Sequence, residues 1–483
     1  MPKEKPTTVD VVKVENKGQK IVLPEGMSLD RAIVALQREK TYNEEQTGIH
    51  APIEGLVTDC AHAFYLACKE QFGYVHGVGI AGWFGMTPPT MLAVRTGPNT
   101  TVQVPWGRME LPGVSGYVQT GMDRTDGQRT TFYIGGQVKR KHERIVMELV
   151  DRTQRLVREQ SIYKSRAFRI RLRDDDGMHI EMPEPHFLEL RPELRHQLIF
   201  NDDVSANVET SIFTMIEHRE RVKQEGVSLK RGVLLAGPWG TGKSMTSLVA
   251  AAIAAANGWT FILAERADEL AEVLRLARMY QPSVVFCEDI DRVMSGERNI
   301  SMDEILNIVD GVESKTAELM VILTTNDVMG INQAMLRPGR LDAVIDVKPP
   351  DAKSAERLVR LYGAGRVDPN EDLTEIGQML AGNIPAVIME VVQRSKLTAI
   401  SRDPEDPGLR VTSADLRIAT LSMQNQLALL APREADKRSD VLKAADLTAK
   451  ATVLAAQIQS GHHVNGEVEG VDSDGSRGLV GSR

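Results

Sequence analysis

Short apolar runs and helix-like patterns alternate through the second half of the chain. The runs at 233–236, 260–264, 284–287 and 319–323 have the length of buried strands. A long alanine-rich helix pattern that ends at Asn257-Gly258 separates the first run from the second, and a helix pattern over 268–280 separates the second run from the third. Strands that alternate with helices form a parallel sheet covered by helices. The pattern therefore predicts an α/β fold.

The first half of the chain follows a different pattern. Apolar positions at helical spacing predict helices over 28–45, 52–72 and 146–157. The segments MLAVRT, TVQVPW and TTFYIGG are separated by turn signals and predict short strands. The stretch FRIRLR alternates with period two, which places its arginines, Arg169, Arg171 and Arg173, on one strand face. We expect an α+β domain here, followed by a proline-bearing linker at 182–193.

The composition narrows the class of protein. A net charge of −8 gives no overall positive field that would attract nucleic acid. The first residues lack the apolar stretch of a signal peptide, and the longest strongly apolar run, 248–256, is half a membrane span. We interpret Cys60, Cys68 and Cys287 as reduced thiols. The expectation is a cytoplasmic protein without a membrane segment.

A glycine loop with the pattern G-x-x-x-x-G-K-S lies between a predicted strand and a predicted helix. Its glycines let backbone N–H groups surround phosphate oxygens, and the helix N-terminus adds its positive dipole end. Lys243 can neutralise the β- and γ-phosphates, and the Ser244 hydroxyl can ligate Mg²⁺. The predicted phosphate-binding residues are Gly237, Pro238, Trp239, Gly240, Thr241, Gly242, Lys243, Ser244 and Met245.

Polar residues follow the third and fourth apolar runs. Glu288 and Asp289 follow the third run and Asn326 follows the fourth, so all three should lie at the carboxyl edge of the sheet beside the glycine loop. One carboxylate can hold the water shell of the metal, and the other can orient or deprotonate the attacking water. Asn326 could hold the water or the γ-phosphate. Arg337 and Arg340 could stabilise charge on the transferring phosphoryl group.

The order of these motifs resembles the AAA family of ATPases, in the branch that remodels proteins. The motifs are RGVLLAGPWGTGKS, VVFCEDID, MDEILNIVDGV, VILTTND and AMLRPGRLDAVIDVKPPD, within residues 198 to about 402. The resemblance implies a P-loop AAA+ module, with a parallel five-stranded sheet between helices and a helical lid, that binds ATP and Mg²⁺ and assembles as a ring, usually of six. It implies that Arg337 and Arg340 act on ATP bound by the neighbouring subunit. It also places LIFNDDV, with Asp203, on the adenine side.

The resemblance and the patterns together predict the order of domains along the chain. A flexible N-terminus spans 1–20, the α+β N-terminal domain for partner or substrate recognition spans 21–190, and the α/β nucleotide-binding subdomain spans 196–348. They are followed by a helical lid at 349–430, a further helix at 431–460 and a disordered Gly/Ser/acid-rich tail at 461–483.

Three features depart from the family pattern. The family usually has Asp before Glu, whereas here Glu288 takes the metal-side place and Asp289 takes the water-side place; either slow hydrolysis or a differently held water follows. The segment 265–280 lacks the aromatic-hydrophobic-glycine triplet of the substrate-gripping loop, which puts threading of a polypeptide in doubt. The lid stretch GNIPAVIMEVV has no obvious arginine sensor.

Residues 139–173 carry twelve Lys/Arg against four Asp/Glu. They form either a surface for a polyanion or a solvated face whose charges pair with acids elsewhere, and the second interpretation is favoured. The leading functional hypothesis is an ATP-hydrolysing homo-oligomeric ring that remodels or disassembles a protein partner chosen by the N-terminal domain. The alternatives are a nucleic-acid-associated motor that uses residues 139–173, and a slowly hydrolysing scaffold held together by ATP.

Overall fold

The structure of the chain is a computed structural model that describes residues 14–16, 19–21, 26–77, 79–82, 85–87, 89–125, 129–291, 317–327, 341–405 and 408–430. Arg337 and Arg340, the motif MDEILNIVDGV, the predicted helix at 431–460 and the predicted tail at 461–483 lie outside these residues. The chain divides into two compact units, 1–416 and 417–483. Among the described helices, none has the length and apolar character needed to cross a membrane.

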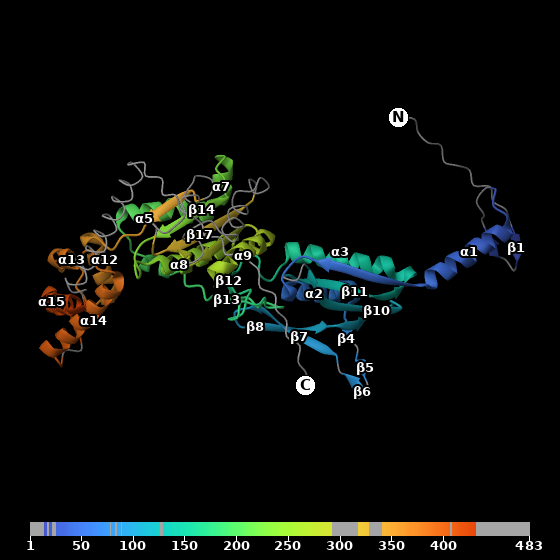
Figure 1. Ribbon diagram of the computed structural model, residues 1–483, viewed down its shortest axis with the longest axis horizontal. Helices are drawn as coiled ribbons and strands as arrows, with labels where there is room; N and C mark the ends of the chain where they lie inside the picture. The colour runs from blue at the N-terminus through green and yellow to red at the C-terminus, as the bar shows by residue number, and fades with distance from the viewer. Residues whose placement is uncertain are drawn as a thin grey trace, which may run out of the picture. The chain divides into compact units, whose positions relative to one another are not determined.

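A seven-stranded sheet forms the centre of the second half of the chain (Figure 1). In sheet order its strands are β13 (His186–Phe187), β12 (Ala167–Ile170), β15 (Thr260–Ala264), β16 (Ser283–Cys287), β17 (Leu319–Thr325), β14 (Arg231–Ala236) and β18 (Ala343–Asp346). All neighbours are parallel except β12 and β13, which are antiparallel. The predicted α/β fold is confirmed, and the strands from β15 to β18 are the expected five parallel strands.

Helices cover both faces of this sheet. They are α4 (Leu194–Gln197), α5 (Asp202–Val208), η2 (Glu209–Phe213), α6 (Thr214–Glu217), α7 (Arg219–Gln224), α8 (Lys243–Ala256), η3 (Ala267–Glu269), α9 (Leu270–Ala277) and η4 (Arg278–Tyr280). Val284 and Phe286 of β16 share a core with α8, whereas Val285 and Cys287 share the opposite core with α9. Because every residue of β16 and β17 is buried, polar side chains reach solvent only beyond the ends of these strands.

Two strands extend the sheet beyond the expected five. Phe168 and Ile170 of β12 are fully buried and Arg169 is exposed, which confirms the predicted alternation. From the sequence, this strand falls within the N-terminal domain and residues 182–193 form a linker; in the structure, β12 pairs with β15 and the linker segment contains β13. Alternation identifies the buried side chains of a strand but not its hydrogen-bonding neighbour, so it could not reveal this pairing.

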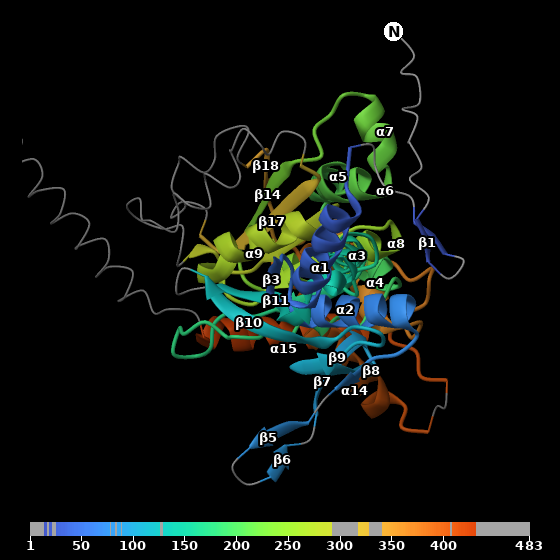
Figure 2. The ribbon, with the colours of Figure 1, turned by 90° about the vertical axis from the view of Figure 1, so that its right-hand side faces the viewer.

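The N-terminal part contains an antiparallel five-stranded sheet in the order β3 (Gln46–Ile53), β11 (Arg129–Lys139), β10 (Gly116–Thr125), β9 (Arg108–Glu110) and β4 (His76–Gly77). The helices α2 (Val57–Phe72) and α3 (Glu143–Glu159) pack together and against β11 (Figure 2). The remaining elements are β1 (Val14–Asn16), β2 (Gln19–Ile21), α1 (Leu29–Glu44), β5 (Ile80–Gly82), β6 (Gly85–Thr87), β7 (Thr90–Gly97), β8 (Thr100–Trp106) and η1 (Arg140–His142). The three predicted helices are confirmed, but the second begins at Val57 rather than at 52, because β3 continues to Ile53.

Beyond Pro350 the described residues are mainly helical, as predicted. The helices are α12 (Ala352–Gly363), α13 (Thr374–Leu380), α14 (Pro385–Arg402) and α15 (Ser413–Leu430). Asp351 begins α12, since its carboxylate accepts a hydrogen bond from the Ser354 N–H at 2.8 Å.

Candidate active site

Three neighbouring strands bring the predicted site residues to one edge of the sheet. β17 lies between β14 and β16, and Ala236 is in register with Thr325, the last residue of β17. Because the strands are parallel, the segments that follow them leave the sheet on the same side. The glycine loop, the acid pair and Asn326 therefore meet, although they are far apart in the sequence.

The glycine loop needs residues without a side chain at two places. A Cβ at Gly237 would lie 2.3 Å from the carbonyl oxygen of Val347, so the loop leaves β14 in direct contact with the segment after β18. Gly242 has a φ of +103° and a Cβ there would lie 3.1 Å from the Phe200 ring. Only glycine adopts this φ without strain directly before α8. The predicted strand, glycine loop and helix are confirmed.

Lys243 lies at the floor of this loop. Its ammonium donates hydrogen bonds to the carbonyl oxygens of Gly237 at 2.6 Å and Pro238 at 2.8 Å, and to Oδ1 of Asn326 at 2.9 Å. Burial lowers the pKa of Lys243, and the nearby carboxylates, led by Asp289, act in the opposite direction. The loop therefore holds a cation beneath its backbone, as a phosphate site requires.

Asn326 connects this cation to the acid pair. Its side-chain amide donates to Oδ1 of Asp289 at 2.7 Å, while its own Oδ1 accepts from Lys243. Asp289 has a φ of +50°, and its backbone N–H donates to Oγ1 of Thr324 at 3.1 Å. Aspartate tolerates this left-handed conformation better than most residues. Glu288 and Asp289 are both exposed, so both carboxylates are open to a ligand.

Asp291 also belongs to this site, and the sequence reasoning missed it. Its carboxylate accepts hydrogen bonds from the Thr325 hydroxyl and from the Asn326 N–H. It thereby ties the end of β17 to the turn that follows β16. The signal was present, because Asp291 is the third carboxylate of VVFCEDID, but the paired-acid reasoning used only the first two.

The segment LIFNDDV links the glycine loop to the beginning of α12. The carbonyl oxygen of Phe200 accepts from the Ser354 hydroxyl at 3.1 Å, and the Phe200 ring lies beside Gly242. Asn201 bonds to the carbonyl oxygen of Pro349 at 3.2 Å and to the N–H of Asp351 at 2.8 Å. Asp203, the predicted binding residue of this segment, is exposed on α5, whereas Phe200 is the residue that contacts the loop.

The remaining predicted loop residues have different exposures. Trp239 is 75% exposed at the tip of the loop and Ser244 is exposed at the start of α8. Thr241 is buried and its hydroxyl donates to the Pro238 carbonyl at 2.9 Å. A Cβ at Gly240 would lie 3.1 Å from Cδ1 of Ile384, so the residue that precedes α14 approaches the loop.

The chemistry of the donor groups fits a phosphate ligand with Mg²⁺. Hydroxyl and carboxylate oxygens are the ligands that Mg²⁺ prefers, and Ser244 and Glu288, both exposed, can supply them here. The described residues contain no group of three or more His, Cys, Asp or Glu that could hold a metal ion by themselves. Such a group is unnecessary for Mg²⁺, which is usually bound by one or two carboxylates together with substrate phosphates and water.

Residues 233–349 match the family model of the ATPase family associated with various cellular activities (AAA). The chain is 28% identical over 234 residues to a 26S proteasome regulatory subunit 8 homolog of Schizosaccharomyces pombe, a match that covers 44% of this chain and 56% of that protein. It is 29% identical over 252 residues to an ATP-dependent zinc metalloprotease FtsH 2 of Sphaerobacter thermophilus, which covers 48% of this chain and 38% of that protein. The ATPase family gene 2 protein of Schizosaccharomyces pombe is 28% identical over 243 residues, with coverages of 47% and 29%. The chain thus spans less than two thirds of each relative.

Proposed function

We propose that the chain binds ATP with Mg²⁺ and hydrolyses ATP to ADP and phosphate, on the premise that residues 233–349, which match the AAA family model, form an AAA domain. The observation that carries the proposal is the hydrogen-bonded series from Lys243 through Asn326 to Asp289. It joins a phosphate-binding cation to an exposed carboxylate through one amide, which is the arrangement needed to align a phosphate and an attacking water.

The glycine loop performs the binding part of the reaction. Its backbone N–H groups and the start of α8 receive the phosphates, and Lys243 neutralises the terminal ones. Ser244 and Glu288 hold the metal, partly through water. Mg²⁺, when bound, supplies positive charge that stabilises the charge on the transferring phosphoryl group. Asp203 and the segment around it stand on the adenine side.

Asp289 performs the proton-transfer part. Its carboxylate accepts a proton from water as the water oxygen bonds to the γ-phosphorus, and the bond from that phosphorus to the bridging oxygen of ADP breaks. Asn326 keeps the Asp289 carboxylate in one orientation, because the opposite end of its amide is held by Lys243. The order Glu288 before Asp289 shortens the base by one methylene relative to the family pattern, so we expect turnover to be slow.

The oligomer and the partner belong to the same proposal. A homo-oligomeric ring, expected to be hexameric, would allow Arg337 and Arg340 to reach ATP bound by the neighbouring subunit. The N-terminal domain would select a protein partner that ATP turnover remodels or disassembles. The motif order, the AAA domain and the names of the relatives, a proteasome regulatory subunit and ATP-dependent proteases, support this part.

A nucleic-acid motor is less well supported. Eight of the twelve basic residues in 139–173 pair with acids: Lys139, Arg140, Lys141, Arg144, Arg152, Arg169, Arg171 and Arg173. Paired charges leave little field for phosphates. The pairing favours the solvated-face interpretation of this segment.

The test is steady-state ATP hydrolysis by the purified full chain beside Lys243→Ala, Asp289→Asn and Asp289→Glu. We expect slow turnover that Asp289→Asn abolishes while ATP still binds, and that Lys243→Ala abolishes together with binding. Turnover unaffected by Asp289→Asn would contradict the assigned base. A wild type that binds ATP without turnover, and that Asp289→Glu activates, would support the ATP-held scaffold instead.

A further inference from the structure

The segment that contains α9 contacts the N-terminal domain at its end. Tyr280, the last residue of η4, is 1% exposed, and its hydroxyl accepts from the Leu56 N–H at 3.2 Å and donates to the Asp59 carboxylate at 3.2 Å. Asp59 lies on α2 and is also 1% exposed. It accepts further hydrogen bonds from the Ser161 hydroxyl at 2.6 Å and the Ile162 N–H at 3.0 Å. A buried carboxylate of one domain is therefore completed by a hydroxyl of the other.

Aromatic rings surround this contact. The Tyr163 ring lies edge-on to Tyr280 with 6.2 Å between centroids, and 5.3 Å from the Phe168 ring of β12. The Tyr163 hydroxyl shares a 2.7 Å hydrogen bond with the Thr58 hydroxyl of α2. Thr58, Asp59, Tyr163 and Tyr280 are at most 2% exposed, so the loss of one polar partner is costly for those that remain.

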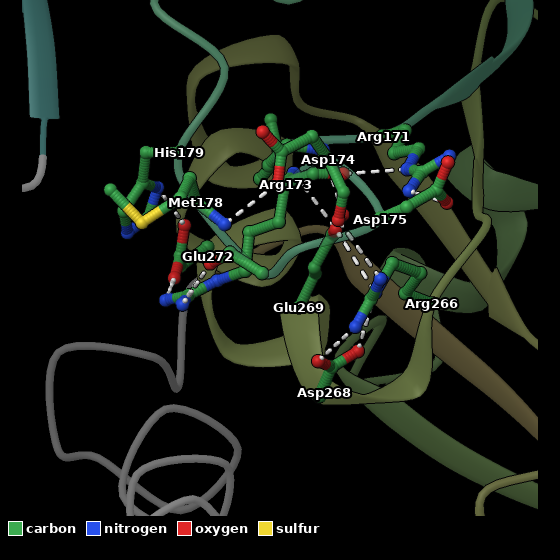
Figure 3. A network of polar contacts seen from close by, with 12 residues as sticks. Arg171, Arg173, Asp174, Asp175, Met178, His179, Arg266, Asp268, Glu269 and Glu272 are labelled. Atoms are coloured by element: carbon green, nitrogen blue, oxygen red, sulfur yellow. Dashed lines mark hydrogen bonds and ion pairs between the residues drawn. The ribbon is translucent and has the colours of Figure 1, made fainter.

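A second buried carboxylate fixes the beginning of the same segment (Figure 3). Glu269 of η3 is fully buried, and its two oxygens accept from the backbone N–H groups of Leu172 at 2.7 Å and Arg173 at 2.9 Å. These N–H groups belong to the second and third residues after β12, where its ladder with β15 has ended. The Glu269 carboxylate therefore supplies two backbone N–H groups with the acceptors that a neighbouring strand would otherwise provide.

Charged groups around Glu269 cover this second contact. Arg173 donates to Glu272 of α9 at 2.6 Å, and His179 lies 3.5 Å from the same carboxylate. Arg266 donates to the carbonyl oxygen of Asp174 at 3.1 Å. Figure 3 shows these side chains converging on Glu269 and Glu272 from both sides of the contact. Asp59 of α2 thus holds the end of the segment, and Glu269 holds its beginning against the chain that leaves β12.

We propose that the N-terminal domain and the segment Glu269–Tyr280 form one cooperative body, and that this body transmits displacements of the N-terminal domain to the acid pair behind β16. β16 begins three residues after Tyr280 and ends directly before Glu288. Partial separation would take the Tyr280 hydroxyl away from the Leu56 N–H and from one oxygen of Asp59, and would leave the N–H groups of Leu172 and Arg173 without the Glu269 carboxylate, which is costly. The contacts at the two ends of the segment therefore form or break together. The link to the acid pair rests on the proposed ATPase function.

The body itself is tested without nucleotide by native-state hydrogen exchange of the full chain in low urea. Tyr280→Phe removes one hydroxyl and Glu269→Gln removes one charge at opposite ends of the segment, and Asp175→Asn alters an exposed ion pair of Arg171 in the same loop. We expect either of the first two variants to accelerate exchange in both 57–72 and 267–280 by the same factor, on the order of tenfold, and the control to change neither. Acceleration confined to one of the two segments would overturn the proposal.

The transmission is tested by adding ATP and Mg²⁺ to the same proteins, with binding monitored separately by tryptophan fluorescence. We expect nucleotide to change exchange at 57–72 in the wild type and in the Asp175→Asn control, and Tyr280→Phe to abolish that response while ATP still binds. ATP binding without any response at 57–72 in the wild type would refute transmission. Absence of ATP binding would instead count against the proposed function, and the experiment without nucleotide would still decide whether the body exists.

Discussion

The ammonium of Lys243 donates a 2.9 Å hydrogen bond to the side-chain oxygen of Asn326, although 83 residues separate them. The nitrogen of the same amide donates to Asp289 at 2.7 Å. Because each end of the amide has a partner of matching kind, the orientation of Asn326 is determined. The ammonium of Lys243 and the carboxylate of Asp289 are therefore positioned by one side chain.

Asn326→Ala removes this connection, and we expect kcat for ATP hydrolysis to fall about 10²-fold with KM nearly unchanged. The reason is that Lys243 still binds phosphate, whereas Asp289 loses the donor that orients it. Steady-state kinetics of the full chain measure both quantities, with Asn370→Ala in the exposed loop between α12 and α13 as the matched control. A raised KM with an unchanged kcat would assign Asn326 to binding alone.

Trp239 provides a direct measure of nucleotide binding. It is 75% exposed at the tip of the glycine loop, whereas Trp259 is fully buried with its indole N–H bonded to the Ile216 carbonyl at 3.1 Å. We expect ATP with Mg²⁺ to change the tryptophan emission, because Trp239 is open to solvent beside the expected phosphate site, whereas Trp259 is buried. Trp239→Phe should remove the change and Lys243→Ala should prevent it. A change of emission that persists in Trp239→Phe would show that another tryptophan responds to ATP.

The sequence predicted the parts of the site whose signals are local. A glycine loop between an apolar strand and a helix has a fixed spacing, and the loop observed at Gly237–Gly242 confirms it. The acids after β16 and Asn326 after β17 were predicted to share an edge, since carboxyl ends of parallel strands meet. The structure brings Asn326 and Asp289 into contact there.

The parts that the sequence did not predict depend on long-range pairing. β12 has the alternation of a half-buried strand, but nothing in its residues specifies β15 as its neighbour. β10 was missed because its glycines obscure the strand pattern. Asp59 and Glu269 looked like ordinary helix acids, and only the packing of distant segments buries them. The burial of these two carboxylates was therefore outside the reach of local patterns.

Removing the buried carboxylate of Glu269 should destabilise the chain. Glu269→Ala leaves the N–H groups of Leu172 and Arg173 without an acceptor, and we expect a loss of about 3 kcal/mol of unfolding free energy. Glu269→Gln retains one acceptor oxygen and should lose less. Urea unfolding measures the difference in unfolding free energy. The control Asp175→Asn, in the loop that contains Leu172 and Arg173, should leave the urea midpoint unchanged. Equal stability of Glu269→Ala and wild type would show that water replaces the carboxylate.

Asp59 should make stability depend on pH. Burial raises the pKa of Asp59 from its usual 3.8 to about 6, against the opposing effect of its hydrogen bonds from Ser161, Ile162 and Tyr280. The folded state then holds the proton more tightly than the unfolded state, so the associated stability is complete below pH 4 and is lost as pH rises through 6. The full change corresponds to about 3 kcal/mol.

Comparison with Asp59→Asn isolates this contribution. The neighbouring Tyr163, Tyr280 and Cys60 have pKa values raised by burial and do not titrate in this range, whereas burial lowers the pKa of His62 on the same helix. His62 is present in both proteins, so its contribution cancels in the difference between their unfolding free energies. Urea unfolding from pH 4.5 to 7.5 should show the stability of wild type falling relative to Asp59→Asn as pH rises. A difference that stays constant over this range would mean that the Asp59 carboxyl binds its proton equally well in the folded and unfolded chain.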